Sequence, residues 1–121
     1  FPPVAACVLP VRIGIGKAIE LNALGQTIDA AEAHRIGLVN EVYARDEFAS
    51  SVETYLDHIR TLSRPVVRLA KRATCLVVRD QILAQLDKAE AIYLDELMRL
   101  ADAHEGIAAF LEKRAPVWTH S

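Results

Sequence analysis

The sequence is poor in the residues that build several kinds of site. Aromatic residues make up 6% of the 121 positions, and there are only two cysteines and one tryptophan. Two cysteines make no disulfide framework, so we expect Cys7 and Cys75 to be buried free thiols in a reducing cytoplasm. The net charge of -2 lacks the basic excess typical of nucleic-acid binders. No apolar run approaches the ~20 residues of a membrane span, so neither nucleic acid nor a membrane is an expected partner.

Small and aliphatic side chains are what the chain has in abundance. Hydrophobic residues make up 52% of the sequence and charged residues 25%, a composition that excludes a disordered chain. Many Ala and Leu residues with few aromatics favour helices that pack through aliphatic side chains. The chain begins FPPVAACVLP, without Met, and this start indicates a piece of a longer protein.

Apolar residues recur at helical spacing along most of the chain. The expected helices are two short ones within 4–25, a capped one within 29–37, long ones over 46–62 and from 65 onward, and a last one over 107–114. Asp29 with Glu32, and Asp102 with Glu105, are predicted to form capping boxes. Pro10 is expected in a first turn or at a break. The run LVNEVYA predicts a short strand or extended segment, so the predicted fold is mostly α and multi-helix with one short extended segment.

Motifs for phosphate, metal or nucleophile chemistry are weak. IGIGKA contains a GxGK, but no Ser or Thr follows Lys17, and Ile19 stands where a dinucleotide fingerprint needs its third glycine. The meeting of two helices explains the stretch better. The four histidines have no metal-ligand spacing, so no metal site is expected. Five basic residues form one cluster along the helix expected from 65 onward: Arg64, Arg68, Lys71, Arg72 and Arg79. We interpret this cluster as a solvated helix face, and a surface that binds anionic phosphates is the alternative.

Three stretches together resemble the enoyl-CoA hydratase/isomerase (crotonase) superfamily. GQTIDAAEAHRIGLVNEV is similar to its G-x-x-I-x-A-x-E-A-x-x-x-G-L-V-N-x-V segment, PVVRLAKRA to a later Pro- and Lys-containing helix, and EGIAAFLEKRAPVW to its C-terminal E-G-x-x-A-F-x-E-K-R-x-P signature. The order and intervals also match, and the similarity spans essentially the whole chain. The resemblance implies the C-terminal region of the crotonase fold: residues 1–44 as the end of the catalytic core and a hinge, and residues 45–121 as a helical region for trimerisation and for covering coenzyme A.

The implied activity is that of an acyl-CoA hydratase, which adds water to an enoyl- or dienoyl-CoA thioester or removes it. Coenzyme A would enter as part of the substrate, with no separate cofactor, and the full-length protein would be a trimer or hexamer. By resemblance, the oxyanion-hole amides and two glutamates of the family lie before Phe1. No catalytic residue is therefore expected in this piece, which would be inactive alone.

The resemblance also implies substrate-binding residues at both ends of the chain. Pro2, Pro3 and Val4 would continue the loop beside the acyl group, Phe110 would line the acyl pocket, and Lys113 would approach a CoA phosphate. A core Phe and a Lys that complements the helix dipole remain the alternatives for the last two.

The start of the chain departs from the common pattern of the family. Pro3 has no N–H to donate to a catalytic water, where many hydratases have glycine. FPPVAACVLP is similar instead to the dienoyl-CoA hydratases of anaerobic aromatic-ring degradation, which act on cyclohexa-1,5-diene-1-carbonyl-CoA. The alternative to a hydratase is a free-standing helical self-association module without catalysis, because nearly every helix has a broad apolar face; a helical nucleic-acid binder ranks third.

Overall fold

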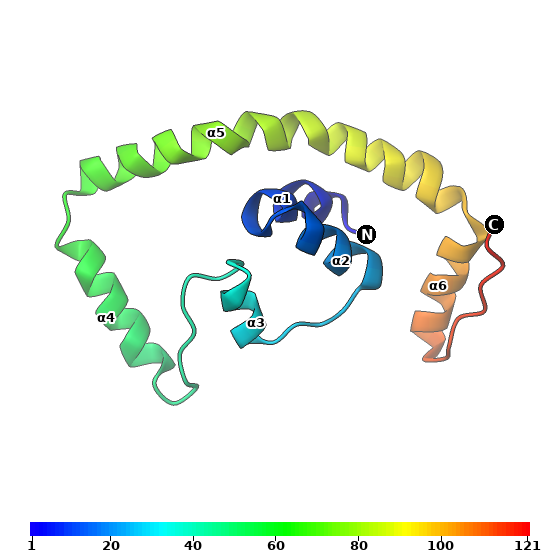
Figure 1. Cartoon of the computed structure of the whole chain (residues 1–121), viewed down its shortest axis with the longest axis horizontal. Helices are drawn as coiled ribbons and strands as arrows, with labels where there is room; N and C mark the ends of the chain where they lie inside the picture. The colour runs from blue at the N-terminus through cyan, green and yellow to red at the C-terminus, as the bar shows by residue number, and fades with distance from the viewer.

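The chain folds as an arch of helices around a smaller helical unit (Figure 1). The computed structural model describes residues 1–121, apart from the side chain of Val77. The helices are α1 (Pro3–Ile13), α2 (Ile15–Leu24), α3 (Ala30–Arg35), α4 (Phe48–Arg60), α5 (Arg64–Ala91), the π-helix η1 (Ile92–Glu96), the 3₁₀-helix η2 (Leu97–Arg99) and α6 (Ala101–Glu112). Helices α4, α5 and α6 form the arch, and α1, α2 and α3 lie within it. The predicted mostly α, multi-helix fold is confirmed.

The first two helices form the predicted pair. They meet at Gly14, whose φ of 80° and ψ of 153° turn the chain sharply, and Ala18 of α2 is 1% exposed. Helix α1 also packs against α5. Pro10 lies inside α1 and neither begins nor ends it, so both expectations for this residue are wrong. The fixed φ of proline suits a helix, and α1 continues through it at the loss of one backbone hydrogen bond.

Half of the first predicted capping box is present. Asp29 Oδ1 accepts a hydrogen bond from the Glu32 N–H at 2.7 Å, as an N-cap should. The Glu32 carboxylate does not close the box, because it binds two cations instead. It accepts from Arg35 Nε at 2.6 Å and lies 3.4 Å from Lys17 Nζ of α2. The Arg35 hydrogen bond lowers the pKa of Glu32 to about 2, and the contact with Lys17 joins α2 to α3.

The connection from α3 to α4 is irregular. Residues 41–44 form neither helix nor strand, since a strand needs a partner and none of the described segments supplies one. Of the two predictions for this run, the strand is therefore wrong. Asp46 is also not the N-cap of α4. It lies in a turn closed by a hydrogen bond from Glu47 N to Ala44 O of 3.1 Å, and the cap is Glu47.

Helix α5 is the longest element and runs across the top of the arch. Pro65 lies in its first turn, as predicted. The winding then changes to the π-helix η1 and the 3₁₀-helix η2 before α6 turns back. Cys75 is exposed and Cys7 half-buried, and both are free. The expectation of a buried thiol is wrong for Cys75, which precedes the stretch of α5 that faces α1.

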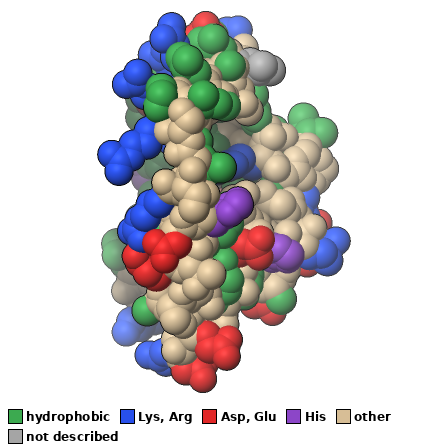
Figure 2. Space-filling model, turned by 90° about the vertical axis from the view of Figure 1, so that its left-hand side faces the viewer, with side chains coloured by type: hydrophobic (Ala, Val, Ile, Leu, Met, Phe, Trp, Pro, Cys, Tyr) green, Lys and Arg blue, Asp and Glu red, His purple; other side chains and the backbone are tan. Residues whose placement is uncertain are grey.

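Most apolar side chains of the arch find no cover within this chain. Only Ala18, Ala33 and Ala109 are buried among the described residues. Large apolar side chains of α4 and α5, such as Phe48, Val66 and Leu69, are more than half exposed. The predicted basic face of α5 is also exposed, and Figure 2 shows Lys and Arg side chains along one edge of the side where α4 and the start of α5 lie. Within the described part of the chain, no helix has both the length and the apolarity to cross a membrane.

Candidate functional site

Two ends of the chain meet at one hollow. Phe1, Pro2 and Pro3 line a cavity of about 890 Å³ together with Tyr93 of η1 and Phe110 of α6. The Phe1 and Tyr93 rings are in edge-to-face contact, with centroids 6.0 Å apart and planes at 83°. Such a contact stabilises two rings beyond their burial. The turn from α5 into α6 therefore brings Phe110 to the start of the chain.

A second cavity continues this hollow along α6. It measures about 580 Å³ and shares Phe1, Tyr93 and Phe110 with the first, and Trp118 is part of its lining. We call the two cavities together the aromatic groove. Pro2 and Pro3 line only the first of the two cavities, and Trp118 lines only the second. Four aromatic side chains around one hollow suit a flat, unsaturated ligand.

Three of the five predicted substrate-binding residues therefore lie together. Pro2, Pro3 and Phe110 line the groove, and Phe110 is 82% exposed. Within this chain, Phe110 therefore lies on the surface. Val4 and Lys113 are not among the residues that line it. Lys113 is the left-handed C-cap of α6, with φ 54°, one turn beyond Phe110.

The π-helix was missed by the analysis of the sequence. Residues 92–96 follow the apolar period of α5, so nothing in the pattern separates them from an α-helix. In a π-helix the backbone hydrogen bonds join residues five apart, so the turn is wider than in an α-helix. Tyr93, the second residue of this turn, contacts Phe1 and lines the groove. Single π-turns within helices are frequent at functional sites.

The second predicted capping box does not form, because both carboxylates bind the end of the chain. The N-cap of α6 is Leu100, without a side-chain cap. Glu105 accepts from the guanidinium of Arg114, at 2.9 Å for the Nη2–Oε2 pair, and from Val117 N at 2.8 Å. Asp102 Oδ1 accepts from Thr119 N at 2.7 Å. Residues 115–121, which we call the strap, therefore lie along α6, as Figure 1 also shows.

The two carboxylates that bind the strap are both stabilised in their ionised form. Hydrogen bonds from Arg114 and the Val117 N–H lower the pKa of Glu105 to about 2. The backbone N–H of Thr119 lowers the pKa of Asp102, which lines the groove. An ionised carboxylate whose oxygens already accept hydrogen bonds is a poor general acid or base. The described residues of the groove can hold and orient an apolar group, but they offer no acid–base pair.

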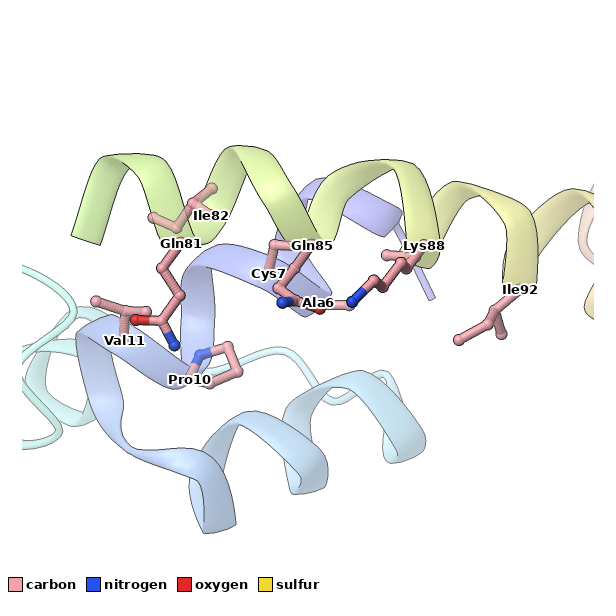
Figure 3. A pocket seen from close by; sticks show the side chains of 10 residues that line it. Ala6, Cys7, Pro10, Val11, Gln81, Ile82, Gln85, Lys88 and Ile92 are labelled. Atoms are coloured by element: carbon pink, nitrogen blue, oxygen red, sulfur yellow. The ribbon is translucent and has the colours of Figure 1, made fainter.

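A separate cavity of about 310 Å³ lies between α1 and α5 (Figure 3). Cys7 and Pro10 line it from α1, and Gln85 and Lys88 from α5. None of the five predicted site residues lines it. No group of three His, Cys, Asp or Glu side chains among the described residues is arranged to hold a metal ion.

Comparison with known proteins decides the family. The family model for enoyl-CoA hydratase/isomerase matches residues 2–121, nearly the whole chain. The chain belongs to the enoyl-CoA hydratase/isomerase family. The resemblance found in the three sequence stretches is thereby confirmed, and the helical arch is a piece of the crotonase fold.

Similar members of the family include bacterial hydratases. The chain is 45% identical over 118 residues to cyclohexa-1,5-dienecarbonyl-CoA hydratase of Thauera aromatica, covering 98% of this chain and 45% of the relative. It is 37% identical over 108 residues to a probable enoyl-CoA hydratase of Mycobacterium leprae, covering 89% of this chain and 42% of the relative. The chain spans less than half the length of these relatives.

A solved structure shows the same arrangement. The crystal structure of an enoyl-CoA hydratase/isomerase from Pseudoalteromonas atlantica superimposes with a TM-score of 0.79 at 29% identity. The match covers 96% of this chain and 46% of that one. The helical arch is therefore part of a larger fold in this family member.

Proposed function

We propose that this chain is the acyl-covering part of a hydratase that adds water to an enoyl- or dienoyl-CoA thioester, or removes it. One observation supports this most strongly: Pro2 and Pro3 from one end of the chain and Phe110 from the other line a single aromatic groove. The start FPPVAACVLP and the 45% identity to a cyclohexa-1,5-dienecarbonyl-CoA hydratase favour a cyclic dienoyl group as the occupant.

The proposal divides the chemistry between this chain and the rest of the protein. The groove of this chain binds the apolar acyl group and excludes water from it. The oxyanion-hole amides and the two glutamates lie in the part of the protein that precedes Phe1, so the 121 residues alone are inactive. Pro3 has no N–H, so the catalytic water takes its hydrogen bonds from other groups. Coenzyme A is part of the substrate, and Lys113, exposed at the end of α6, approaches one of its phosphates.

The exposed apolar faces of α4 and α5 support a homo-oligomer, a trimer or hexamer, in the full-length protein. Residues 45–121 form its helical region, and residues 1–44 are the end of the core with the hinge. We also propose a cytoplasmic location, because Cys7 and Cys75 are free thiols, as is typical of proteins in a reducing compartment. The second candidate, a self-association module without catalysis, rests on the same exposed faces.

Turnover by the protein expressed from the whole reading frame tests the proposal. We expect it to hydrate cyclohexa-1,5-diene-1-carbonyl-CoA and the 121-residue chain to leave this thioester unchanged. Phe110→Ala should lower kcat/KM about tenfold or more, because the acyl group loses one aromatic wall. Leu24→Ala is the control, since Leu24 is also exposed but lies on α2 and does not line the groove.

The two candidates give different results in this assay. No turnover of any enoyl- or dienoyl-CoA by the whole protein would overturn the hydratase and favour the self-association module. Turnover by the 121-residue chain alone would overturn the division of the chemistry. Equal losses of kcat/KM in Phe110→Ala and Leu24→Ala would show that the groove does not bind the acyl group.

A further inference from the structure

The strap is tied to α6 on both sides of Trp118. On one side, Val117 N donates to Glu105 Oε1 at 2.8 Å. On the other, Thr119 N and His120 N donate to the two oxygens of Asp102 at 2.7 and 2.8 Å. Hydrogen bonds to ionised carboxylates are stronger than those between neutral groups. The two ties therefore hold the backbone of Trp118 in one place beside the helix.

The indole ring of Trp118 lies directly over Gly106 of α6. A Cβ atom built on Gly106 would come within 3.3 Å of Cη2 and 3.5 Å of Cζ3 of the ring. The shorter distance requires the ring to move by a few tenths of an ångström, and the longer one is an ordinary van der Waals contact. Glycine inside a helix costs about 0.5–1 kcal/mol relative to alanine, and here its missing side chain makes room for the ring.

The ring of Trp118 forms part of the wall of the aromatic groove. Trp118 lines the cavity of about 580 Å³ together with Phe1, Tyr93 and Phe110, while Pro2 and Pro3 line the other cavity of the groove. A large rigid ring in the wall of an apolar hollow takes up space that a longer group would need. A flat cyclic group can lie against such rings, whereas a long straight chain needs the space that Trp118 fills.

We infer that Trp118 is a specificity-determining residue, which the strap holds over Gly106 so that the groove accepts flat cyclic acyl groups and rejects long straight ones. This inference rests on the proposed function, because it assumes that the groove binds the acyl group of a thioester. The strap then has the role of holding Trp118 in the wall of the groove, and this role is separate from the acid–base chemistry of hydration.

The test compares two substrates in the protein from the whole reading frame. The ratio of kcat/KM for a long straight-chain enoyl-CoA to that for cyclohexa-1,5-diene-1-carbonyl-CoA should rise about tenfold or more in Trp118→Ala, because pocket shape discriminates at this scale. Trp118→Phe should give a smaller rise, and it replaces Trp118→Ala if that variant fails to fold. Val117→Ala removes a neighbouring apolar side chain that does not line the groove and should leave the ratio unchanged.

An unchanged ratio in both Trp118 variants would overturn the inference while leaving the hydratase intact. A rise in Val117→Ala equal to that in Trp118→Ala would also overturn it, because the ring would then have no special part. If the wild-type protein turns over neither thioester, the proposed function falls. The inference is then decided by the ratio of the two dissociation constants in the same variants: a tenfold shift toward the long chain sustains it, and no shift ends it.

Discussion

Replacing Gly106 with alanine tests the contact between α6 and the strap. In a helix without close neighbours, Gly→Ala stabilises by about 0.5–1 kcal/mol. At Gly106 the new methyl group would lie 3.3 Å from the Trp118 ring. Because Trp118 is half exposed and its ring can move slightly, the cost is about 1 kcal/mol, the low end of the range for overpacking in a core. The two effects nearly cancel, so Gly106→Ala should leave the opening free energy of α6 almost unchanged. In a Trp118→Ala background only the gain remains, and α6 should become more stable by about 0.5–1 kcal/mol.

Native-state amide hydrogen exchange measures both effects in one experiment, because it reports local opening free energies. In Gly106→Ala, the amides of Thr119 and His120 should exchange about fivefold faster, which corresponds to about 1 kcal/mol. Gly16→Ala is the control, since Gly16 lies in α2 with nothing within 4 Å of the added Cβ. Gly16→Ala should change the opening free energy of α2 by the same amount with Trp118 present and in the Trp118→Ala background. An equal stabilisation of α6 by Gly106→Ala with and without Trp118 would mean that the Trp118 ring does not oppose the added methyl group.

Three further outcomes follow from the local geometry. The pKa of Glu105 is lowered from 4.5 to about 2, so the stabilisation that Glu105 gives the strap is complete above pH 4.5 and disappears as the pH falls toward 2. The fluorescence of Trp118 should change over the same pH range, and a constant fluorescence would contradict this role of Glu105. Gly14→Ala should lower the free energy of unfolding by about 1–3 kcal/mol, because φ 80° with ψ 153° strains any side chain; an unchanged denaturation midpoint would be evidence against this turn. Asp29→Ala should destabilise α3 by about 1 kcal/mol, seen as faster exchange of the Glu32 amide, and unaltered exchange would mean that the cap is dispensable.

The sequence predicted the helices well because their signals are local. Apolar spacing located α1, α2, α4 and most of α5, and Asp29 at the start of α3 is an N-cap in the structure. The errors arose where distant residues compete for the same group. Glu32 binds Arg35 and Lys17 instead of closing its capping box, and no spacing rule ranks these partners.

The groove was only partly predictable for the same physical reason. Pro2, Pro3 and Phe110 came from a family resemblance, and their proximity depends on the turn of the whole arch. Neither Tyr93 nor Trp118 was predicted to line the groove. The first lies in a π-helical turn that no sequence pattern marked, and the position of the second depends on the strap, where Asp102 binds Thr119 instead of capping α6. A mid-helix glycine twelve residues before a lone tryptophan was the one available hint.

Photo-crosslinking shows directly where the acyl group binds, when the protein from the whole reading frame is treated with an acyl-CoA that carries a photoreactive group on its acyl end. We expect the label to attach within the aromatic groove, at Tyr93, Phe110 or Trp118. Excess unmodified acyl-CoA should prevent this labelling, and Phe110→Ala should reduce it. Labelling confined to the basic face of α5, or to the cavity between α1 and α5, would contradict the claim that this groove holds the acyl group.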